Sequence, residues 1–288
     1  MALAPATSGW AAQLQLGFAR RGDATALVRR RHHGPLAVQR PFFPEGPGVC
    51  HVYVLHPPGG VVGGDSLDID VDVGAGAHAL LTTPAAGKAY RAMRTGATAH
   101  VRQTLHVGAH GALEWLPQEL ILHDGAEVSL RTIVSLDVDA RFIGLDGLCF
   151  GLPARAEPWT RGRCRQRLEV WRAGEPLVIE RGCFDAGPDL DVDVHRATWG
   201  LRGLPVLATL IASPAPEASV IDALRARGAG AGGDDIAGVS VVADGAAVVC
   251  RYAGASAERA RRFAQDAWSL LRPAVTGLAP RAPRIWST

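Results

Sequence analysis

Many short stretches of the chain alternate apolar and polar residues, which is the pattern of β-strands that bury one face. The clearest is SLDIDVDV at 66–73, where leucine, isoleucine and valine would line one face and aspartates the other. Further strands are predicted at 50–56, 99–107 and 126–138, in ALLTT and ALEWLP, and as hairpins within 167–182 and 238–252, around Ala173-Gly174 and Asp244-Gly245. Short strands with turn residues between them predict a mainly β, antiparallel-rich architecture.

Two segments near the end of the chain have helical spacing instead. PEASVIDALRARG at 216–228 begins with proline and ends with glycine, as helices prefer. In the stretch 256–273 apolar residues recur every three or four positions, Ser256 can cap the first turn, and Pro273 is expected to end the helix. Because no linker or internal repeat interrupts the chain, we expect a single domain over 1–288.

Composition excludes several classes of partner. The 288 residues are 48% hydrophobic and carry a formal net charge of +2, with aromatic residues at 6%. Such a chain can bury a core, but it has neither the basic surface nor the aromatic interleaving of a nucleic-acid binder. No secretory signal or apolar run long enough for a membrane span is evident. The five cysteines are scattered without a C-x-x-C, as in a protein of a reducing compartment, so we expect a soluble cytoplasmic protein.

The only lysine, Lys88, lies in LLTTPAAGKAYR at 80–91. The stretch resembles a phosphate-binding loop but fails as one, because Ala89 follows the lysine and Thr82 occupies the place of the first glycine. A lone lysine among arginines reflects either drift in composition or a need for a compact ammonium group.

The loop HPPGGVVGGD at 56–65 ends on a single carboxylate, Asp65. Two prolines followed by two glycine pairs predict an irregular backbone, which either forms a tight corner or approaches another group closely. The aspartates at 68, 70 and 72 lack the glycine and glutamate of a calcium loop, so we interpret them as a solvated strand face.

Some side chains could bind a metal. His100 and His106 would share a strand face, as would Cys50 and His56, and imidazoles suit nickel, zinc or copper. Their spacings match no established metal motif, so they remain weak candidates. One functional hypothesis is a β-barrel metal-dependent enzyme that uses His100, His106 and a carboxylate.

Three glutamates are candidates for a catalytic or a structural role. Glu114 and Glu119 flank a Trp-Pro turn and could act as a paired acid and base, or simply anchor the turn to a core tryptophan. Glu180 lies in an apolar strand, where a buried carboxylate needs a partner, and its neighbour Arg181 is the expected one.

Taken together, HPPGGVVGGD, TTPAAGKAYR, LEWLPQELILHDGA, LEVWRAGEPLVIERG, WSLLRPAVTG and PRIWST resemble the urease accessory proteins of the UreD (UreH) family, in order, from about Trp10 to Thr288. The resemblance implies a protein that is not an enzyme, with strands coiled in a helical stack and two helices beside it. It implies partners UreF, the GTPase UreG through UreF, and apo-urease, and a role in nickel insertion. No tightly bound cofactor is implied, because nickel would bind only transiently.

The resemblance further implies a tunnel that passes nickel through the protein. Four residues are its candidates by motif position: Glu45, Asp65, Lys88 and Glu180. Carboxylates offer weak, exchangeable contacts to such a cation, and Lys88 is expected to pair with one of them.

The chain departs from the family pattern at Gly87 and in GLPARAEP, where the family usually has Gly-Arg and later Gly-Glu and this chain has Leu152 and Ala156 in those places. Any role for 151–158 is therefore open. A third hypothesis, a β-rich binding module without a metal, also remains open on the residues alone.

Overall fold

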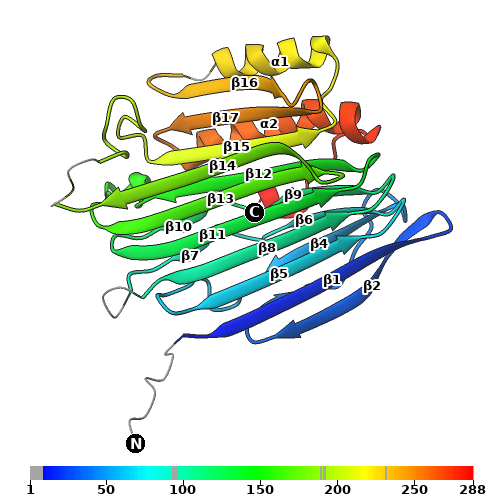
Figure 1. Ribbon diagram of the computed structural model, residues 1–288, viewed down its shortest axis with the longest axis horizontal. Helices are drawn as coiled ribbons and strands as arrows, with labels where there is room; N and C mark the ends of the chain where they lie inside the picture. The colour runs from blue at the N-terminus through cyan, green and yellow to red at the C-terminus, as the bar shows by residue number, and fades with distance from the viewer. Residues whose placement is uncertain (1–8, 93–96, 189, 191–192, 231, 288) are drawn as a thin grey trace, which may run out of the picture.

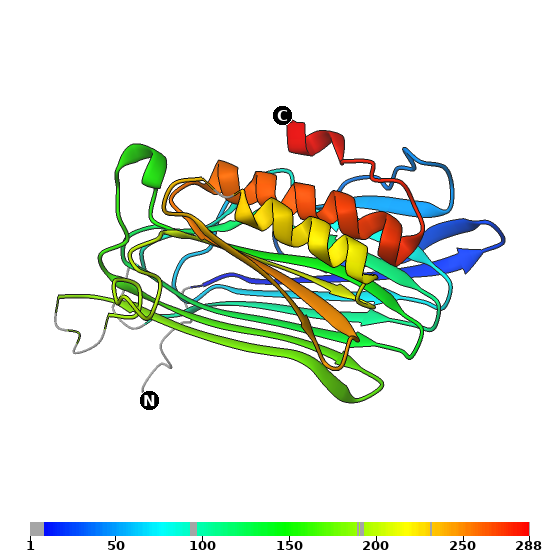
Figure 2. The same ribbon diagram turned by 90° about the horizontal axis from the view of Figure 1, so that it is seen from above.

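The computed structural model describes residues 9–92, 97–188, 190, 193–230 and 232–287. The chain folds into two β-sheets that lie face to face, with both α-helices on the outer side of one sheet (Figures 1 and 2). One hydrophobic core fills the space between the sheets, and a second lies between the outer sheet face and the helices. The prediction of a mainly β protein with two helices towards the C-terminus is confirmed.

The first sheet has seven strands in the order β14-β13-β11-β8-β5-β1-β2. These are β1 (Ala11–Arg21), β2 (Ala24–His33), β5 (Ser66–Val73), β8 (Ala99–Val107), β11 (Ala126–Leu136), β13 (Gly162–Arg172) and β14 (Glu175–Ala186).

The second sheet has ten strands, with the main order β16-β17-β15-β12-β9-β6-β4-β3 and with β10 and β7 attached beside β12. These are β3 (Ala37–Val38), β4 (Val49–Leu55), β6 (His78–Thr82), β7 (Gly87–Ala89), β9 (Ala112–Leu116), β10 (Leu120–Leu122), β12 (Arg141–Phe150), β15 (Val206–Ser213), β16 (Ile236–Val242) and β17 (Ala247–Gly254).

Apart from the short strands β7 and β10, successive strands from β4 to β13 alternate between the two sheets, so the chain winds as a flattened coil and the expected helical stack is present. Each turn places a new strand beside the strand of the previous turn and in the same direction. The structure therefore corrects the expectation of mainly antiparallel pairing, which holds only towards the ends of the sheets. Alternating hydrophobicity shows which face a strand buries, but not the direction of its neighbour.

Most predicted strands are present with little change. The strands at 66–73 and 99–107 have the expected bounds, and the apolar side chains of β5 point into the core between the sheets. Both hairpins are confirmed, and Ala173 and Gly174 have the positive φ values of +49° and +87° that a tight hairpin turn requires. The strands β1, β2, β12 and β15 were not predicted.

The two helices are α1 (Ala218–Ala229) and α2 (Ala257–Thr276), and two short 3₁₀ turns cover Pro153–Arg155 and Arg284–Ser287. Ser256 caps α2 as predicted, because its side chain accepts a hydrogen bond from the Arg259 amide. The expected end at Pro273 is wrong: the helix continues to Thr276 and ends where Gly277 adopts a φ of +76°. No helix among the described residues is long and apolar enough to cross a lipid bilayer.

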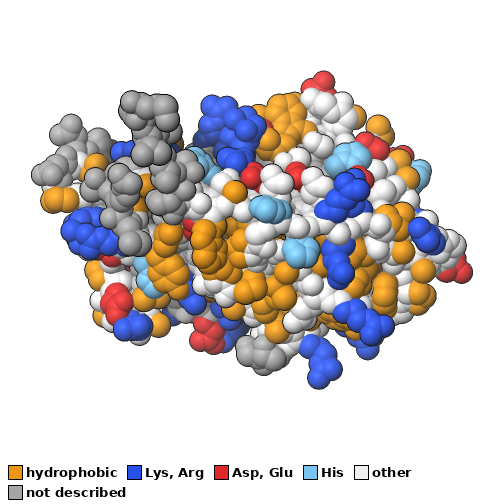
Figure 3. Space-filling model, turned by 90° about the horizontal axis from the view of Figure 1, so that it is seen from below, with side chains coloured by type: hydrophobic (Ala, Val, Ile, Leu, Met, Phe, Trp, Pro, Cys, Tyr) orange, Lys and Arg blue, Asp and Glu red, His pale blue; other side chains and the backbone are white. Residues whose placement is uncertain are grey.

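The edge strand β2 is protected by charge. Its last residues, 29–33, are three arginines and two histidines, and all five are exposed. Figure 3 looks onto this side of the molecule, where basic and histidine side chains lie among hydrophobic ones. Charged side chains on an edge strand discourage pairing with another sheet.

Candidate functional site

A cavity of about 270 Å³ lies between the two sheets. Apolar side chains from both sheets supply most of its wall, since these are the inward positions of alternating strands. A few polar and ionisable side chains interrupt this wall: His56, Lys88, Gln103, Glu119, Thr132 and Asp146 are among them. An apolar space with a few convergent polar groups is the usual form of a binding or conducting site.

A second cavity, of about 520 Å³, continues towards β14, β16 and β17. Asp146 and Leu148 of β12 belong to the walls of both cavities. Glu180 and Arg251 lie in the wall of the second. We call the two adjoining cavities the inter-sheet passage.

Asp146 lies where the two cavities meet. Burial raises the pKa of its carboxyl to about 6, against the opposing effect of a 3.0 Å hydrogen bond from the Gln166 side-chain amide, and the nearby Glu180 raises it further. A carboxylic acid with such a pKa exchanges a proton near neutral pH, so it can bind a cation and release it again.

Glu180 points inward from β14 and pairs with Arg251 of β17, whose Nε lies 3.0 Å from the carboxylate. This contact joins the two sheets across the second cavity. The prediction that Glu180 pairs with Arg181 is wrong. Adjacent residues of a strand point to opposite faces, so Arg181 lies on the outer face.

Lys88 on β7 lies in the wall of the first cavity, as does His56. Among the described residues Lys88 forms no ion pair within 4 Å, so the expected pairing with a wall carboxylate is not found. Burial lowers the pKa of His56, although Asp65 opposes the effect, so the imidazole is neutral at pH 7 and able to bind a metal.

The glycine-rich loop before β5 has both of the roles considered for it. Asp65 is buried and accepts backbone hydrogen bonds from Trp10 and Val62, each at 2.8 Å, which fixes a corner. Gly60 permits close approach, because a Cβ there would lie 2.7 Å from the Lys88 carbonyl oxygen. Asp65 thus supports the loop and is not part of the wall of either cavity.

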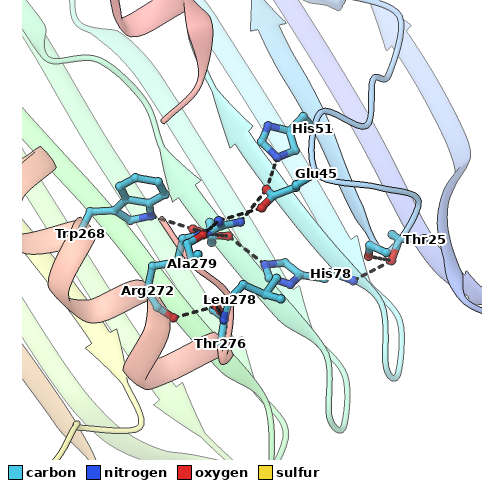
Figure 4. A network of polar contacts seen from close by, with 11 residues as sticks. Thr25, Glu45, His51, His78, Trp268, Arg272, Thr276, Leu278 and Ala279 are labelled. Atoms are coloured by element: carbon cyan, nitrogen blue, oxygen red, sulfur yellow. Dashed lines mark hydrogen bonds and ion pairs between the residues drawn. The ribbon is translucent and has the colours of Figure 1, made fainter. Parts of the chain in front are cut away.

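Glu45 lies in a different place, a buried cluster under the end of α2 (Figure 4). Arg272 of α2 donates to Glu45 at 2.6 and 2.8 Å and to Glu114 of β9 at 3.1 Å. The His51 Nε2 lies 2.6 Å from Glu45 Oε1, and the His78 Nε2 lies 2.9 Å from Glu114 Oε1.

Both carboxylates of this cluster are held ionised. Burial acts to raise the pKa of Glu114, but hydrogen bonds and charge from His78, Arg272 and the Trp268 indole outweigh it, and the pKa is lowered. The pKa of Glu45 is lowered in the same way by Arg272 and His51. The cluster clamps α2 onto the second sheet, and it is separate from the inter-sheet passage.

The proposed acid–base pair is not formed. Glu114 anchors Trp268 and Arg272, whereas Glu119 forms an ion pair with Arg261 at 3.0 Å. A tryptophan is indeed the partner of one glutamate, but it comes from α2 rather than from the neighbouring turn.

The weak metal candidates do not gather into one site. His100 and His106 lie on the outer face of β8, where His106 pairs with Asp72 at 3.0 Å, and Cys50 is fully buried in the core between the sheets. The part of the chain that the structure describes contains no group of three or more His, Cys, Asp or Glu arranged to hold a metal ion. No observation therefore favours the metal-dependent enzyme.

Sequence reasoning missed the central wall residue, Asp146, and its partner Gln166, and it missed Arg251, the partner of Glu180. One signal was available: Asp146 is the single charged residue in the otherwise apolar stretch FIGLDGLCF, which indicates a buried charge. Nothing in the sequence pairs it with residues 20 or more positions away.

The coiled pair of sheets and the passage between them define a β-rich scaffold whose mainly apolar interior carries a few polar and ionisable side chains. A family described as "UreD urease accessory protein" matches residues 11–287. The chain belongs to this family of urease accessory proteins, which assist urease maturation as chaperones and are not enzymes.

Individual relatives match over nearly their whole length. The urease accessory protein UreD of Azoarcus sp. (strain BH72) is 47% identical over 288 residues, covering 100% of this chain and 97% of the relative. The protein of the same name from Alkalilimnicola ehrlichii is 45% identical over 285 residues, covering 99% and 94%. That of Pseudomonas entomophila is 44% identical over 283 residues, covering 98% and 96%.

Proposed function

We propose that this chain passes nickel through the inter-sheet passage to apo-urease, in a complex with UreF and, through UreF, with the GTPase UreG. The observation that supports the route is the meeting of the two cavities at Asp146, with Lys88 on one side and Glu180 on the other. Nickel is the cargo in this proposal, held only in transit and not as a resident cofactor. The five cysteines, all unpaired, fit a cytoplasmic site of action.

The wall chemistry suits a cation that has to leave again. Single carboxylates and neutral imidazoles are ligands for nickel, and a passage needs them separated so that no step binds tightly. His56 and Asp146 offer one contact each, and the proton that competes for Asp146 weakens the bound state.

The charged residues near the ends of this route would set its potential. The Arg251 guanidinium holds the Glu180 carboxylate in place and offsets part of its charge. Lys88, half-buried and without an ion pair to any described residue, would temper the negative potential around Asp146 with a flexible ammonium group.

The test is reconstitution of urease from purified wild-type or variant chain, cognate UreF, UreG, GTP, bicarbonate and nickel-free urease, with nickel in urease measured by mass spectrometry. Asp146→Asn keeps the shape and the Gln166 hydrogen bond but removes the charge, so we expect the complex to form while nickel occupancy of urease falls severalfold. Lys88→Arg is expected to lower occupancy as well, because a wider guanidinium would enter the cavity.

Asp70→Asn is the matched control, since Asp70 lies on the outer face of β5 and away from both cavities. Unchanged nickel occupancy with Asp146→Asn would overturn the proposed route. If omission of the wild-type chain itself made no difference, the proposed role in nickel insertion would be wrong.

A further inference from the structure

In the part of the chain that the structure describes, no helix covers the outer face of the seven-stranded sheet, because α1 and α2 both pack on the other sheet (Figure 2). On this bare face the strand register places four arginines directly opposite one another in a single row. The row crosses β8, β11, β13 and β14 and consists of Arg102, Arg131, Arg167 and Arg181. Neighbouring strands lie about 4.8 Å apart, so the row spans roughly 15 Å.

Two more arginines of β13 extend the row into a patch. Arg163 and Arg165 occupy the same face, and we call all six side chains the arginine face. Three of the six form ion pairs with two acids on the same four strands: Asp185 binds both Arg163 at 3.3 Å and Arg165 at 2.8 Å, and Glu169 binds Arg167.

The other three arginines of the arginine face have fewer acidic partners. Arg102 binds Asp68 of β5 at 2.6 Å. Arg131 and Arg181 are exposed and form no ion pair within 4 Å among the described residues. Like charges directly opposite in a sheet destabilise the fold, so this row costs stability in the free protein.

We propose that the arginine face docks onto an acidic surface of a partner protein. Guanidinium groups bind carboxylates in a two-pronged geometry, and a row of them matches a surface that presents several carboxylates over the same distance. Binding would remove the like-charge repulsion that the free sheet carries.

The surroundings favour a protein over a nucleic acid. The aspartates of β5 border the row on one side and would repel a phosphate backbone that crosses the sheet. On the other side lie the half-buried Trp171 and Ile179, which is 47% exposed. Arginine, tryptophan and exposed aliphatic side chains together are typical of the centre of a protein–protein interface.

The choice of partners for a test rests on the proposed function. Wild-type chain and the double variant Arg131→Glu/Arg181→Glu would be titrated separately against cognate UreF and nickel-free urease by biolayer interferometry at about 0.1 and about 1 M NaCl, where the screening length is about 10 and about 3 Å. Neither substituted arginine forms an ion pair in the described structure, so the fold should be preserved; circular dichroism and thermal unfolding would check this. The double variant Arg131→Gln/Arg181→Gln serves as a milder second test.

The matched control is Arg30→Glu/Arg31→Glu on the exposed edge strand β2, which changes the net charge by the same amount. We expect the Arg131/Arg181 variant to bind one of the two partners at least about tenfold more weakly at low salt, the glutamine variant to show a smaller loss, and the control to bind like wild type. At high salt the difference should shrink.

Equal binding by wild type and the Arg131/Arg181 variant would overturn this inference alone and leave the nickel route standing. An equal loss in the β2 control, or tighter binding of wild type to polyuridylic acid than to either protein, would also overturn it. If wild type bound neither protein, the proposed function would fail and this inference with it.

Discussion

Replacing Asp146 by asparagine tests whether the buried carboxylate in the wall of the passage lowers the free energy of unfolding. The pKa of this carboxyl is raised from 3.8 to about 6 by burial. Between these pH values the folded chain binds more protons than the unfolded chain, so stability falls as the pH rises, and the full cost of the charge is present above pH about 6. Two pKa units at about 1.4 kcal/mol each give a cost of about 3 kcal/mol.

Asparagine carries no charge and can still accept the Gln166 hydrogen bond. We therefore expect the free energy of unfolding of Asp146→Asn to exceed that of wild type by about 3 kcal/mol at pH 7.5 and by about half as much at pH 5. Urea unfolding followed by circular dichroism at the two pH values measures both differences. Asp70→Asn should change stability by less than about 0.5 kcal/mol at either pH.

A variant less stable than wild type at pH 7.5, or a difference independent of pH, would refute this reasoning. A gain in stability together with a loss of nickel transfer is expected of a functional site, because such sites retain groups that the fold alone would not favour.

Three further predictions follow from the same structure. Arg272→Met should lower the free energy of unfolding by about 3–5 kcal/mol in urea titrations, because two buried carboxylates lose their shared counter-charge; a loss below about 1 kcal/mol would contradict this. Ala156→Gly should raise the free energy of unfolding by about 1 kcal/mol, since Ala156 has a φ of +55°. Ala154→Gly in the same turn should not raise it, and urea unfolding of both variants would compare them. Ellman's reagent should titrate one thiol in the native chain and five in urea, because Cys183 is the only exposed cysteine and burial raises, for example, the pKa of Cys50 to about 11.

Much of the fold could be predicted because the relevant physics is local. Alternation along β5 predicted which face is buried, Ala173-Gly174 predicted a hairpin, and Ser256 predicted the start of α2. The direction of strand pairing could not be predicted from the residues, since it depends on the coil that joins strands a full turn apart. Pro273 was misjudged because a helix packed on a sheet tolerates one missing backbone hydrogen bond.

The candidate site was predicted only in part, for the same reason. Lys88 and Glu180 lie in the wall of the passage, but Glu45 and Asp65 have found partners elsewhere. The sequence indicated that Glu180 needs a partner of opposite charge, and the prediction took the adjacent Arg181. The actual partner, Arg251, is 71 positions away on the opposite sheet, a contact that only the three-dimensional fold creates.

The clamp under α2 has a consequence for how the chain is made. It joins Glu114 to Arg272, 158 positions later, so the ribosome completes most of the coil before this contact can form. Until α2 emerges, only α1 can cover the apolar outer face of the second sheet, and the part on β15 that α2 covers, which includes Val206 and Leu210, stays exposed. During that interval the nascent chain presents an aggregation-prone surface, and the synthesis of α2 determines whether it becomes a core.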